Sequence, residues 1–546
     1  MVVEARGDTG RYGGGEMNGA GRESKLPSNR HLILLEILCF IFLMPYWGYL
    51  LLHKGIVPFW GDETFTLRVG QGSWGNFKSD ILSDVHPPLY FALNWFINHL
   101  SRLLTGDFFT GRTLELILSM ALYLVIPVEL MRIRKFPAAG FTGIACASIF
   151  IITSAHLLLF LPMMRYYGLA ALLVFITSIQ LFPDEKIPKS AKIWTLPKHY
   201  VLFGIALWLA LATSYLTVIV VPAYFLFITR MEKSYRDKYL KSLAITLVCA
   251  IPLLILAIYQ SQAITGSEFP GLLPFVKGFI ARFGFTVYSF LLGEFIRPWD
   301  FYLSLPALAA LVFLLFLAYR VKTDRFEHLI NLLLWISLPL GVLVLTFLGI
   351  GLEFSASRLT FLAPFFLLLL VQAPFLDGVT LTQRNVGITA IVLLIILNMV
   401  STVNYLLGRN YIQSTYIIPW QEISNDLGDY GMHWPIVLCD DDTFKYWLPW
   451  GPMEETPVIN LHALTPESAE AIFTESDWVC VVFSPSVFSQ EEVESLIYRY
   501  SGGKPELVEE KDYLVEDETS MRWKSMLLGR EISKVKKKLV VYNIQR

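Results

Sequence analysis

Charged residues are scarce in this 546-residue chain. They make up 16% of it, and hydrophobic residues make up 54%, whereas soluble domains carry about 25% charged residues. The deficit is concentrated in long apolar runs, and a run of about 20 apolar residues matches the hydrocarbon core of a bilayer. An excess of positive charge is also absent, since 44 basic residues face 46 acidic ones. The composition therefore excludes an ordinary soluble domain and does not suggest a nucleic-acid partner.

Cysteine is equally rare, and its placement excludes two kinds of site. Three of the five cysteines lie inside apolar runs, and no CxxC spacing occurs. A zinc site and a disulfide framework are therefore not expected, and only Cys439 and Cys480 could pair. The chain also lacks an internal repeat and an N-glycosylation sequon. The missing sequon favours a prokaryotic plasma membrane as the location.

The apolar runs predict an α-helical polytopic membrane protein with about eleven transmembrane helices. Residues 1–30 are glycine-rich and charged, so we expect a disordered cytoplasmic tail there. The expected spans are 31–52, 112–131, 138–157, 163–182, 200–214, 216–230, 242–260, 302–319, 328–350, 359–375 and 385–406.

Lysine and arginine clusters follow the second, fourth, sixth and eighth spans. The positive-inside rule places these clusters, and with them the N-terminus, on the cytoplasmic side. The long loops 53–111 and 261–301 then lie outside. The apolar stretch 275–296 would invert this order if it crossed the membrane, so we expect it to be a re-entrant or surface helix.

Residues 407–546 regain the composition of a soluble domain. Strand-like apolar runs occur at Pro435–Cys439, Pro457–Leu461 and Trp478–Phe483, and a helical stretch follows at Ser489–Tyr500. This alternation predicts a small extracytoplasmic α/β domain. The chain thus divides into a tail (1–30), a membrane module (31–406) and this domain (407–546).

The first outer loop carries an acidic pair, Asp62-Glu63, about ten residues beyond the first expected span. Adjacent carboxylates repel each other and are costly to desolvate at a membrane surface. One of them could be the general base for an incoming hydroxyl. The alternative is a solvated pair that caps a helix beginning near Thr64.

The same loop carries the string Asp84-Val85-His86-Pro87-Pro88-Leu89. Two prolines are tolerated in a first helical turn, and apolar residues then recur with helical spacing from Leu89 to Leu103, with a polar stripe of Asn94, Asn98 and Arg102 opposite. We expect a helix on the membrane surface that holds Asp84 and His86 just before its N-terminus, where a phosphate would be favoured. The alternative for His86 is a hydrogen-bonded loop histidine.

These two motifs together resemble the first lumenal loop of the protein O-mannosyltransferases (glycosyltransferase family 39). They also resemble the wider GT-C class of membrane glycosyltransferases, including the aminoarabinose and Rgt-type transferases. The likeness is strong over the loop motifs and loose over the span layout of 31–406. It departs at Tyr90-Phe91, where the mannosyltransferases have Gly-Lys. The resemblance implies a GT-C-like fold, a polyprenyl- or dolichyl-phosphate sugar as donor, and Asp62 as the base or acceptor-orienting group.

Two arginines fit an anionic lipid donor. Arg165-Tyr166 stands at the outer mouth of the fourth expected span and resembles an Arg-Tyr feature of such transferases. Arg358 stands at the outer mouth of the tenth. A guanidinium binds phosphate bidentately and would neutralise the leaving group. The alternative for each arginine is a side chain that reaches the lipid headgroups.

The expected reaction moves a sugar to a hydroxyl of a lipid, glycan or protein acceptor, with inversion at the anomeric carbon. Asp62 takes the hydroxyl proton, and Glu63, Asp84 and His86 orient the acceptor and the phosphate. Asp62, Asp84 and His86 could instead hold a divalent cation such as Mg²⁺ or Mn²⁺. The sequence does not identify the sugar or the acceptor.

Two other functions remain open. A transporter or flippase would carry ionisable groups at the bilayer midplane, whereas Glu36, Glu115, Glu129 and His156 fall near the ends of spans. A nucleotide-sugar enzyme could use Asp440-Asp441-Asp442, which follows the strand-like Val437–Cys439. No glycine-rich phosphate loop precedes that strand, so the triplet is better interpreted as a strand-to-helix turn.

Overall fold

The computed structural model describes most of the chain beyond residue 60. The expected tail 1–30 and the first expected span lie outside the described residues. The described residues are 61–106, 112–132, 140–182, 199–261, 271–320, 325–349, 352–376, 378–407, 409–410, 412, 420–429, 437–440, 458–461, 464, 478–485, 487–514, 518–528 and 536–545.

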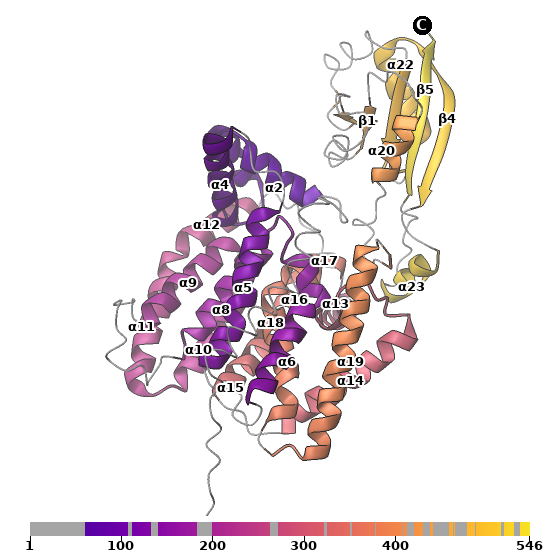
Figure 1. The fold of residues 1–546 in the computed structure, drawn as a ribbon. Helices are drawn as coiled ribbons and strands as arrows, with labels where there is room; N and C mark the ends of the chain where they lie inside the picture. The colour runs from indigo at the N-terminus through magenta and orange to yellow at the C-terminus, as the bar shows by residue number, and fades with distance from the viewer. Residues whose placement is uncertain are drawn as a thin grey trace, which may run out of the picture.

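A bundle of apolar helices forms the body of the molecule, and three helices of the first outer loop lie at one end of it (Figure 1). The loop helices are α2 (Gly61–Gln71), α3 (Trp74–Ser83) and α4 (Leu89–Thr105). The bundle contains α5 (Thr113–Arg132), α6 (Gly140–Thr153), α7 (Ala155–Phe160), α8 (Tyr167–Ile179), α9 (His199–Thr213), η2 (Tyr215–Val220), α10 (Val221–Thr229), α11 (Lys233–Cys249), α12 (Ile251–Ser261), α13 (Leu272–Leu292), α14 (Phe301–Arg320), α15 (Arg325–Leu332), η3 (Leu333–Ser337), α16 (Leu338–Phe347), α17 (Leu352–Arg358), η4 (Thr360–Leu362), α18 (Ala363–Gln372), η5 (Ala373–Phe375) and α19 (Leu381–Leu406).

Five continuous helical stretches are long and apolar enough to cross a membrane, which makes the chain an integral membrane protein. They are Lys233–Gln260, Leu272–Leu292, Phe301–Tyr319, Arg325–Phe347 and Leu381–Leu406. Shorter apolar helices occupy Thr113–Ile126, Tyr167–Ile179, His199–Thr213, Tyr215–Thr229 and Thr360–Phe375. Each of these ten stretches except Leu272–Leu292 coincides with an expected span. The expected span 138–157 is divided at Ser154, whose side chain accepts a hydrogen bond from the Leu157 amide and caps α7. The number of crossings stays a prediction.

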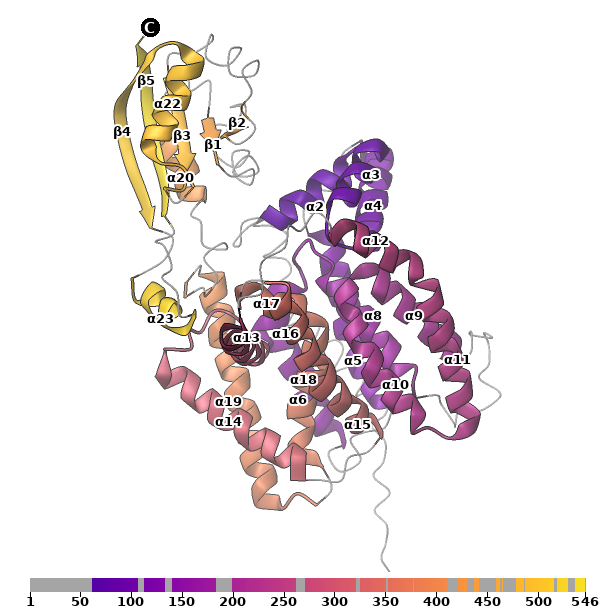
Figure 2. The same cartoon turned by 180° about the vertical axis from the view of Figure 1, so that it is seen from behind.

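Helix α13 differs from its neighbours in direction. The stretch 275–296 was expected to be a re-entrant or surface helix, yet Leu272–Leu292 has the length and hydropathy of a membrane span. Figure 2 shows α13 nearly end-on, across the direction in which α8 and α9 run. Helix α13 therefore lies across the other helices, although its length and hydropathy would allow it to cross a membrane.

Helix α4 is amphipathic, but two of the three residues in its polar stripe are buried, and only Arg102 is exposed. Its apolar positions Phe96 and Leu103 are exposed on the outside of the helix, as a helix on a membrane surface requires. Asn94 and Asn98 are buried instead. They pack against Gly70 of α2, where an added Cβ would lie 2.2 Å from Asn94 Oδ1. These two asparagines therefore pack α4 closely against α2.

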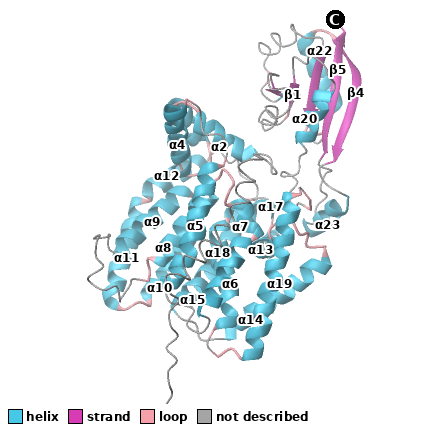
Figure 3. Cartoon of the chain, viewed as in Figure 1, coloured by secondary structure: helices cyan, strands magenta, loops and turns pink. Residues whose placement is uncertain are grey.

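The C-terminal region folds into a five-stranded sheet with helices on both faces, confirming the predicted small α/β domain (Figure 3). The strand order is β2-β1-β3-β5-β4, in which β1 pairs in parallel with β2 and β3, and β5 pairs antiparallel with β3 and β4. Alternate residues of β3 face opposite ways: Cys480 and Val482 pack toward α20, and Val479 and Val481 toward α22. The elements are α20 (Trp420–Asp429), β1 (Val437–Cys439), β2 (Val458–Asn460), β3 (Trp478–Phe483), α22 (Gln490–Ser501), β4 (Lys504–Leu514), α23 (Glu518–Leu528) and β5 (Lys536–Gln545).

The sheet domain and the loop helices lie at the same end of the bundle (Figure 1). Trp523 of α23 stacks on Trp299, with ring centroids 6.4 Å apart, and meets the edge of Phe301 at 5.8 Å. These contacts join the C-terminal region to the segment between α13 and α14. Cys439 and Cys480 are both buried and neither is part of a disulfide, so the pairing that the sequence left open is not formed.

Candidate active site

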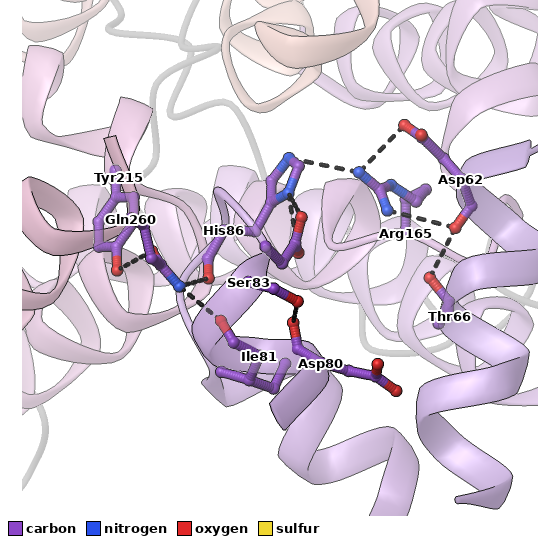
Figure 4. A network of polar contacts seen from close by, with 10 residues as sticks. Asp62, Thr66, Asp80, Ile81, Ser83, His86, Arg165, Tyr215 and Gln260 are labelled. Atoms are coloured by element: carbon purple, nitrogen blue, oxygen red, sulfur yellow. Dashed lines mark hydrogen bonds and ion pairs between the residues drawn. The ribbon is translucent and has the colours of Figure 1, made fainter. Parts of the chain in front are cut away.

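Four predicted site residues form one chain of polar contacts at the end of the bundle where α2, α3 and α4 lie (Figure 4). Asp84 lies just after α3, His86 lies before α4, Arg165 lies in the turn between α7 and α8, and Asp62 lies in the first turn of α2. His86 Nδ1 is 3.1 Å from Asp84 Oδ2, and His86 Nε2 is 3.3 Å from Arg165 Nη2. The same guanidinium nitrogen is 3.1 Å from Asp62 Oδ2. Residues from three parts of the sequence therefore share one network.

The contacts of His86 define its protonation. A carboxylate can only accept hydrogen bonds, so His86 Nδ1 is protonated and donates a hydrogen bond to Asp84. His86 Nε2 is then unprotonated and accepts a hydrogen bond from Arg165. Burial lowers the pKa of His86 below its ordinary value, and the charges of Arg165 and Arg358 lower it further. The hydrogen bond and charge of Asp84 act in the opposite direction and offset only part of this effect. Burial alone would raise the pKa of Asp84, but the hydrogen bond and charge of His86, with the charge of Arg165, lower it overall. The pair is thus a neutral histidine oriented by an ionised aspartate.

Asp62 is the accessible acid of the network. Its side chain is 38% exposed, whereas that of Arg165 is 3% exposed. Arg165 also donates to the Asp62 backbone carbonyl at 3.2 Å through its other terminal nitrogen. Within the described part of the chain, Asp62 Oδ1 has no hydrogen-bond partner. Asp62 therefore presents one free carboxylate oxygen to an incoming molecule while Arg165 holds the other.

Glu63 has the opposite environment. It is fully buried, and both oxygens are occupied: Arg112 donates to them at 2.8 Å and 2.6 Å, and the Met164 amide donates to Oε1 at 2.8 Å. These bonds join α2 to the start of α5 and to the turn that carries Arg165. Both oxygens of Glu63 are thus engaged in holding these segments together, and its predicted catalytic or acceptor-orienting role stays a prediction.

Gln260, at the end of α12, holds the backbone of the segment that carries His86. The buried Gln260 amide donates to the backbone carbonyls of Ile81 at 2.8 Å and His86 at 3.2 Å. Tyr215 in turn donates to Gln260 Oε1 at 2.9 Å. Figure 4 shows this clamp on the side of His86 away from Arg165. The backbone around His86 is thereby tied to η2 and α12.

Tyr166 and Arg358 border the network in different ways. The Tyr166 ring is buried, 5.1 Å from the His86 ring and 5.6 Å from the Arg165 guanidinium carbon, so it packs beneath both. Arg358 ends α17 and is partly exposed. Its charge acts on both His86 and Tyr167. Among the described residues it makes no hydrogen bond or ion pair. Arg358 is therefore the cation of this site that remains available to an anion.

The residues proposed for a divalent cation do not fit one. The positively charged Arg165 stands between Asp62 and His86, where a shared cation would have to lie. Both oxygens of Asp84 lie within 3.2 Å of His86 Nδ1. Within the described ranges no group of three or more His, Cys, Asp or Glu side chains is suited to hold a metal.

Three residues of this site were not predicted from the sequence: Arg112, Gln260 and Tyr215. The sequence did contain a sign of the first two. Arg112 stands at the start of an apolar run, as Arg165 does, and Gln260 is a polar residue at the end of a different apolar run. Polar side chains in such positions need partners. Tyr215 had no comparable signal, because aromatic residues are common throughout these helices.

In the C-terminal domain, Asp440 is engaged within its own fold. Its Oδ1 is 2.7 Å from the Lys537 ammonium, with both side chains buried, and its Oδ2 accepts from the Ser484 amide at 2.7 Å. Asp441 and Asp442 lie outside the described residues. The contacts of Asp440 support the interpretation as a structural turn.

Comparisons with known proteins place few constraints on this chain. No family model matches it, and no curated protein matches its sequence. Among solved structures, it is similar to ArnT from Cupriavidus metallidurans bound to undecaprenyl phosphate, with 11% sequence identity, a TM-score of 0.45, and coverage of 94% of this chain and 98% of that one.

Proposed function

We propose that this protein is a GT-C-like glycosyltransferase that moves a sugar from a polyprenyl- or dolichyl-phosphate donor to an acceptor hydroxyl on the extracytoplasmic side. The observation that carries the proposal is the ion pair between a partly exposed Asp62 and the buried Arg165, in a network whose His86 also feels the charge of a second arginine, Arg358. A carboxylate that can take a proton beside cations that can hold a leaving phosphate is the combination that such a transfer requires.

In the proposed reaction the acceptor oxygen attacks the anomeric carbon while Asp62 Oδ1 takes its proton. The bond between that carbon and the phosphate oxygen breaks, and the lipid phosphate leaves with the bonding electrons. The new bond forms opposite the leaving group, so the anomeric configuration inverts. Arg165 holds the second oxygen of Asp62 in place, and His86 and Asp84 hold Arg165.

Arg358 binds the donor phosphate in this proposal, because it is partly exposed and has no partner among the described residues. The Arg165 side chain is only 3% exposed, so its contribution is the orientation of Asp62 and a positive field at the phosphate. The exposed apolar face of α4 would rest on the bilayer surface at the same end of the bundle. A lipid-borne phosphate could then reach Arg358 without leaving the membrane.

The proposed membrane is a prokaryotic plasma membrane. The proposed orientation within it is the one that the sequence suggested, with the N-terminus inside. Two features support it: α11 begins with Lys233 and α15 with Arg325, both at the end of the bundle opposite α2 and α4 (Figure 1). The C-terminal domain would then face the outside together with the site.

A transporter or flippase is the alternative, and the buried ionisable residues bear on it. Glu115 is fully buried and accepts from Tyr90 at 2.5 Å. His156 is fully buried between the hydroxyls of Ser289 at 2.9 Å and Thr360 at 3.1 Å. Both make close contacts with fixed neighbours, which favours a structural role.

The decisive experiment compares lipid and glycan mass spectra of cells that lack the protein with cells that carry wild type or Asp62→Asn. Loss of the protein should cause a polyprenyl-phosphate sugar to accumulate. Wild type should remove it, and Asp62→Asn should lower transfer by roughly 100-fold or more, because a positioned general base contributes about 10²–10⁴-fold. Equal complementation by both, at equal amounts in the membrane, would refute the proposed mechanism. Sugar transfer by the purified protein would separate it from a carrier.

A further inference from the structure

A groove between α9 and α11 lies at the edge of the bundle, away from the candidate active site. The two helices run side by side in both views (Figures 1 and 2). Its volume is about 760 Å³, and its walls include Val201, Ile205 and Trp208 from α9 and Ile245 and Cys249 from α11.

The floor of the groove is a close helix contact. A Cβ on Gly204 would lie 2.5 Å from Ser242 Oγ, and the Thr246 hydroxyl donates to the Gly204 carbonyl at 3.1 Å. The larger apolar side chains on either side point outward, and Val201, Ile205 and Ile245 are exposed. The result is an open apolar channel rather than an internal cavity.

The groove has a positive end and an apolar length. Lys238 and Lys241 line it near the start of α11, and both are exposed. From Lys238 to Cys249 the helix rises about 16 Å. The nearby acid Asp237 pairs with Arg236 at 3.4 Å, so the lysines are not neutralised by it. Positive charge at one end of a hydrocarbon-lined channel is complementary to one phosphate with an attached acyl chain.

We propose that this groove binds an anionic phospholipid, with its phosphate at Lys238 and Lys241 and an acyl chain along Val201, Ile205 and Trp208. The lysine end of the groove lies at the end of the bundle opposite α2 and α4, so the phosphate position is separate from the proposed donor site and does not depend on the proposed function. Lysine binds a phosphate as a point charge. The helical stretch Lys233–Gln260 has the smallest buried share, 17%, among the described candidate spans, as a lipid-facing helix would.

The test uses the full chain in phosphatidylcholine bilayers with a small fraction of phosphatidylglycerol whose acyl chains carry bromine. Bromine quenches tryptophan fluorescence only at close range, and Trp208→Phe identifies the contribution of Trp208. The quenching of Trp208 fluorescence should show that brominated phosphatidylglycerol binds about 10- to 30-fold more tightly than brominated phosphatidylcholine, because two lysines attract its phosphate.

Lys238→Gln/Lys241→Gln should remove the preference, and high salt should weaken it in the wild type. The matched control is Lys233→Gln/Arg325→Gln, which removes two charges from the same end of the bundle and should keep the preference. Equal quenching by the two lipids, or a preference that survives Lys238→Gln/Lys241→Gln, would overturn the proposal. So would displacement of phosphatidylglycerol by unlabelled polyprenyl phosphate, which would assign the groove to the carrier lipid.

Discussion

Asp62 and Glu63 are adjacent in the sequence, but their surroundings give them different tasks. Glu63 is fully buried and tied to Arg112, whereas Asp62 is 38% exposed and keeps one oxygen free. Successive residues at a helix start point in different directions, so one carboxylate can anchor the turn while the other faces the solvent. The identity of the acidic pair was evident in the sequence, and this division of roles was not.

Glu63→Gln should therefore lower stability rather than alter chemistry alone. The change leaves Arg112 buried opposite a neutral amide, and breaking a buried ion pair on one side costs about 3–5 kcal/mol. Thermal unfolding in detergent should show a clearly reduced midpoint for Glu63→Gln and a smaller reduction for Asp62→Asn, because the Asp62 side chain is 38% exposed and water can compensate in part for its lost charge. An unchanged midpoint together with lost sugar transfer would instead place Glu63 in the reaction.

Acid should weaken the site through His86. Its pKa is lowered in the folded protein, so the unfolded chain binds the proton more readily than the folded one. The stabilisation is complete above about pH 6.5, the ordinary histidine value, and is lost as the pH falls through the lowered folded pKa. Protonation of Nε2 would also remove the acceptor that Arg165 uses.

Unfolding midpoints measured from pH 7.5 to pH 5 for wild type and His86→Gln check this expectation. The wild type should lose more stability toward acid than the variant, because the other histidines titrate in both. Parallel curves would show that His86 does not titrate differently on folding.

At the scale of elements, the contact between α2 and α4 sets the position of Asp62 relative to His86. Gly70 allows Asn94 to approach the α2 backbone, and a Cβ there would lie 2.2 Å from Asn94 Oδ1. Gly70→Ala should force the helices apart, and a displacement of about 1 Å can cost roughly 100-fold in rate. Alanine favours a helix over glycine by about 1 kcal/mol, so helix propensity cannot cause the loss.

Gly75→Ala in α3 is the matched control, since the nearest atom to its Cβ would be 3.9 Å away. Sugar transfer and the unfolding midpoint should both stay near wild type in Gly75→Ala. If Gly70→Ala retained full transfer, the packing of α2 on α4 would not control the geometry of the site.

Elements of the fold were predictable where hydrophobic pattern decides them. The apolar runs located the bundle helices, and the strands β1, β2 and β3 fall within the three predicted runs. The antiparallel pair β4 and β5 was missed, because the Lys504–Leu514 stretch is rich in charge and its pairing depends on a partner strand. For α13 the order of the basic clusters predicted a re-entrant or surface helix, and hydropathy alone would have predicted a span, so the hydrophobic pattern did not decide the direction of this helix.

At the scale of the whole molecule, the fold brings the first outer loop, the turn before α8 and the end of α17 to one end of the bundle. The sequence indicated each of these segments separately through its charged residues. It could not show that Arg165 lies between Asp62 and His86, because that arrangement follows from how distant helices pack. This geometry also separates the two arginines, leaving Arg358 as the one open to a ligand.

The affinity of the purified protein for polyprenyl phosphate tests the central claim most directly, because every donor of the proposed class shares that group. Arg358→Gln should weaken binding roughly 10- to 100-fold, the value of a hydrogen-bonded charge pair. The control Arg68→Gln removes an exposed guanidinium from α2 and should bind as wild type does. Equal affinity of Arg358→Gln and wild type would contradict the account.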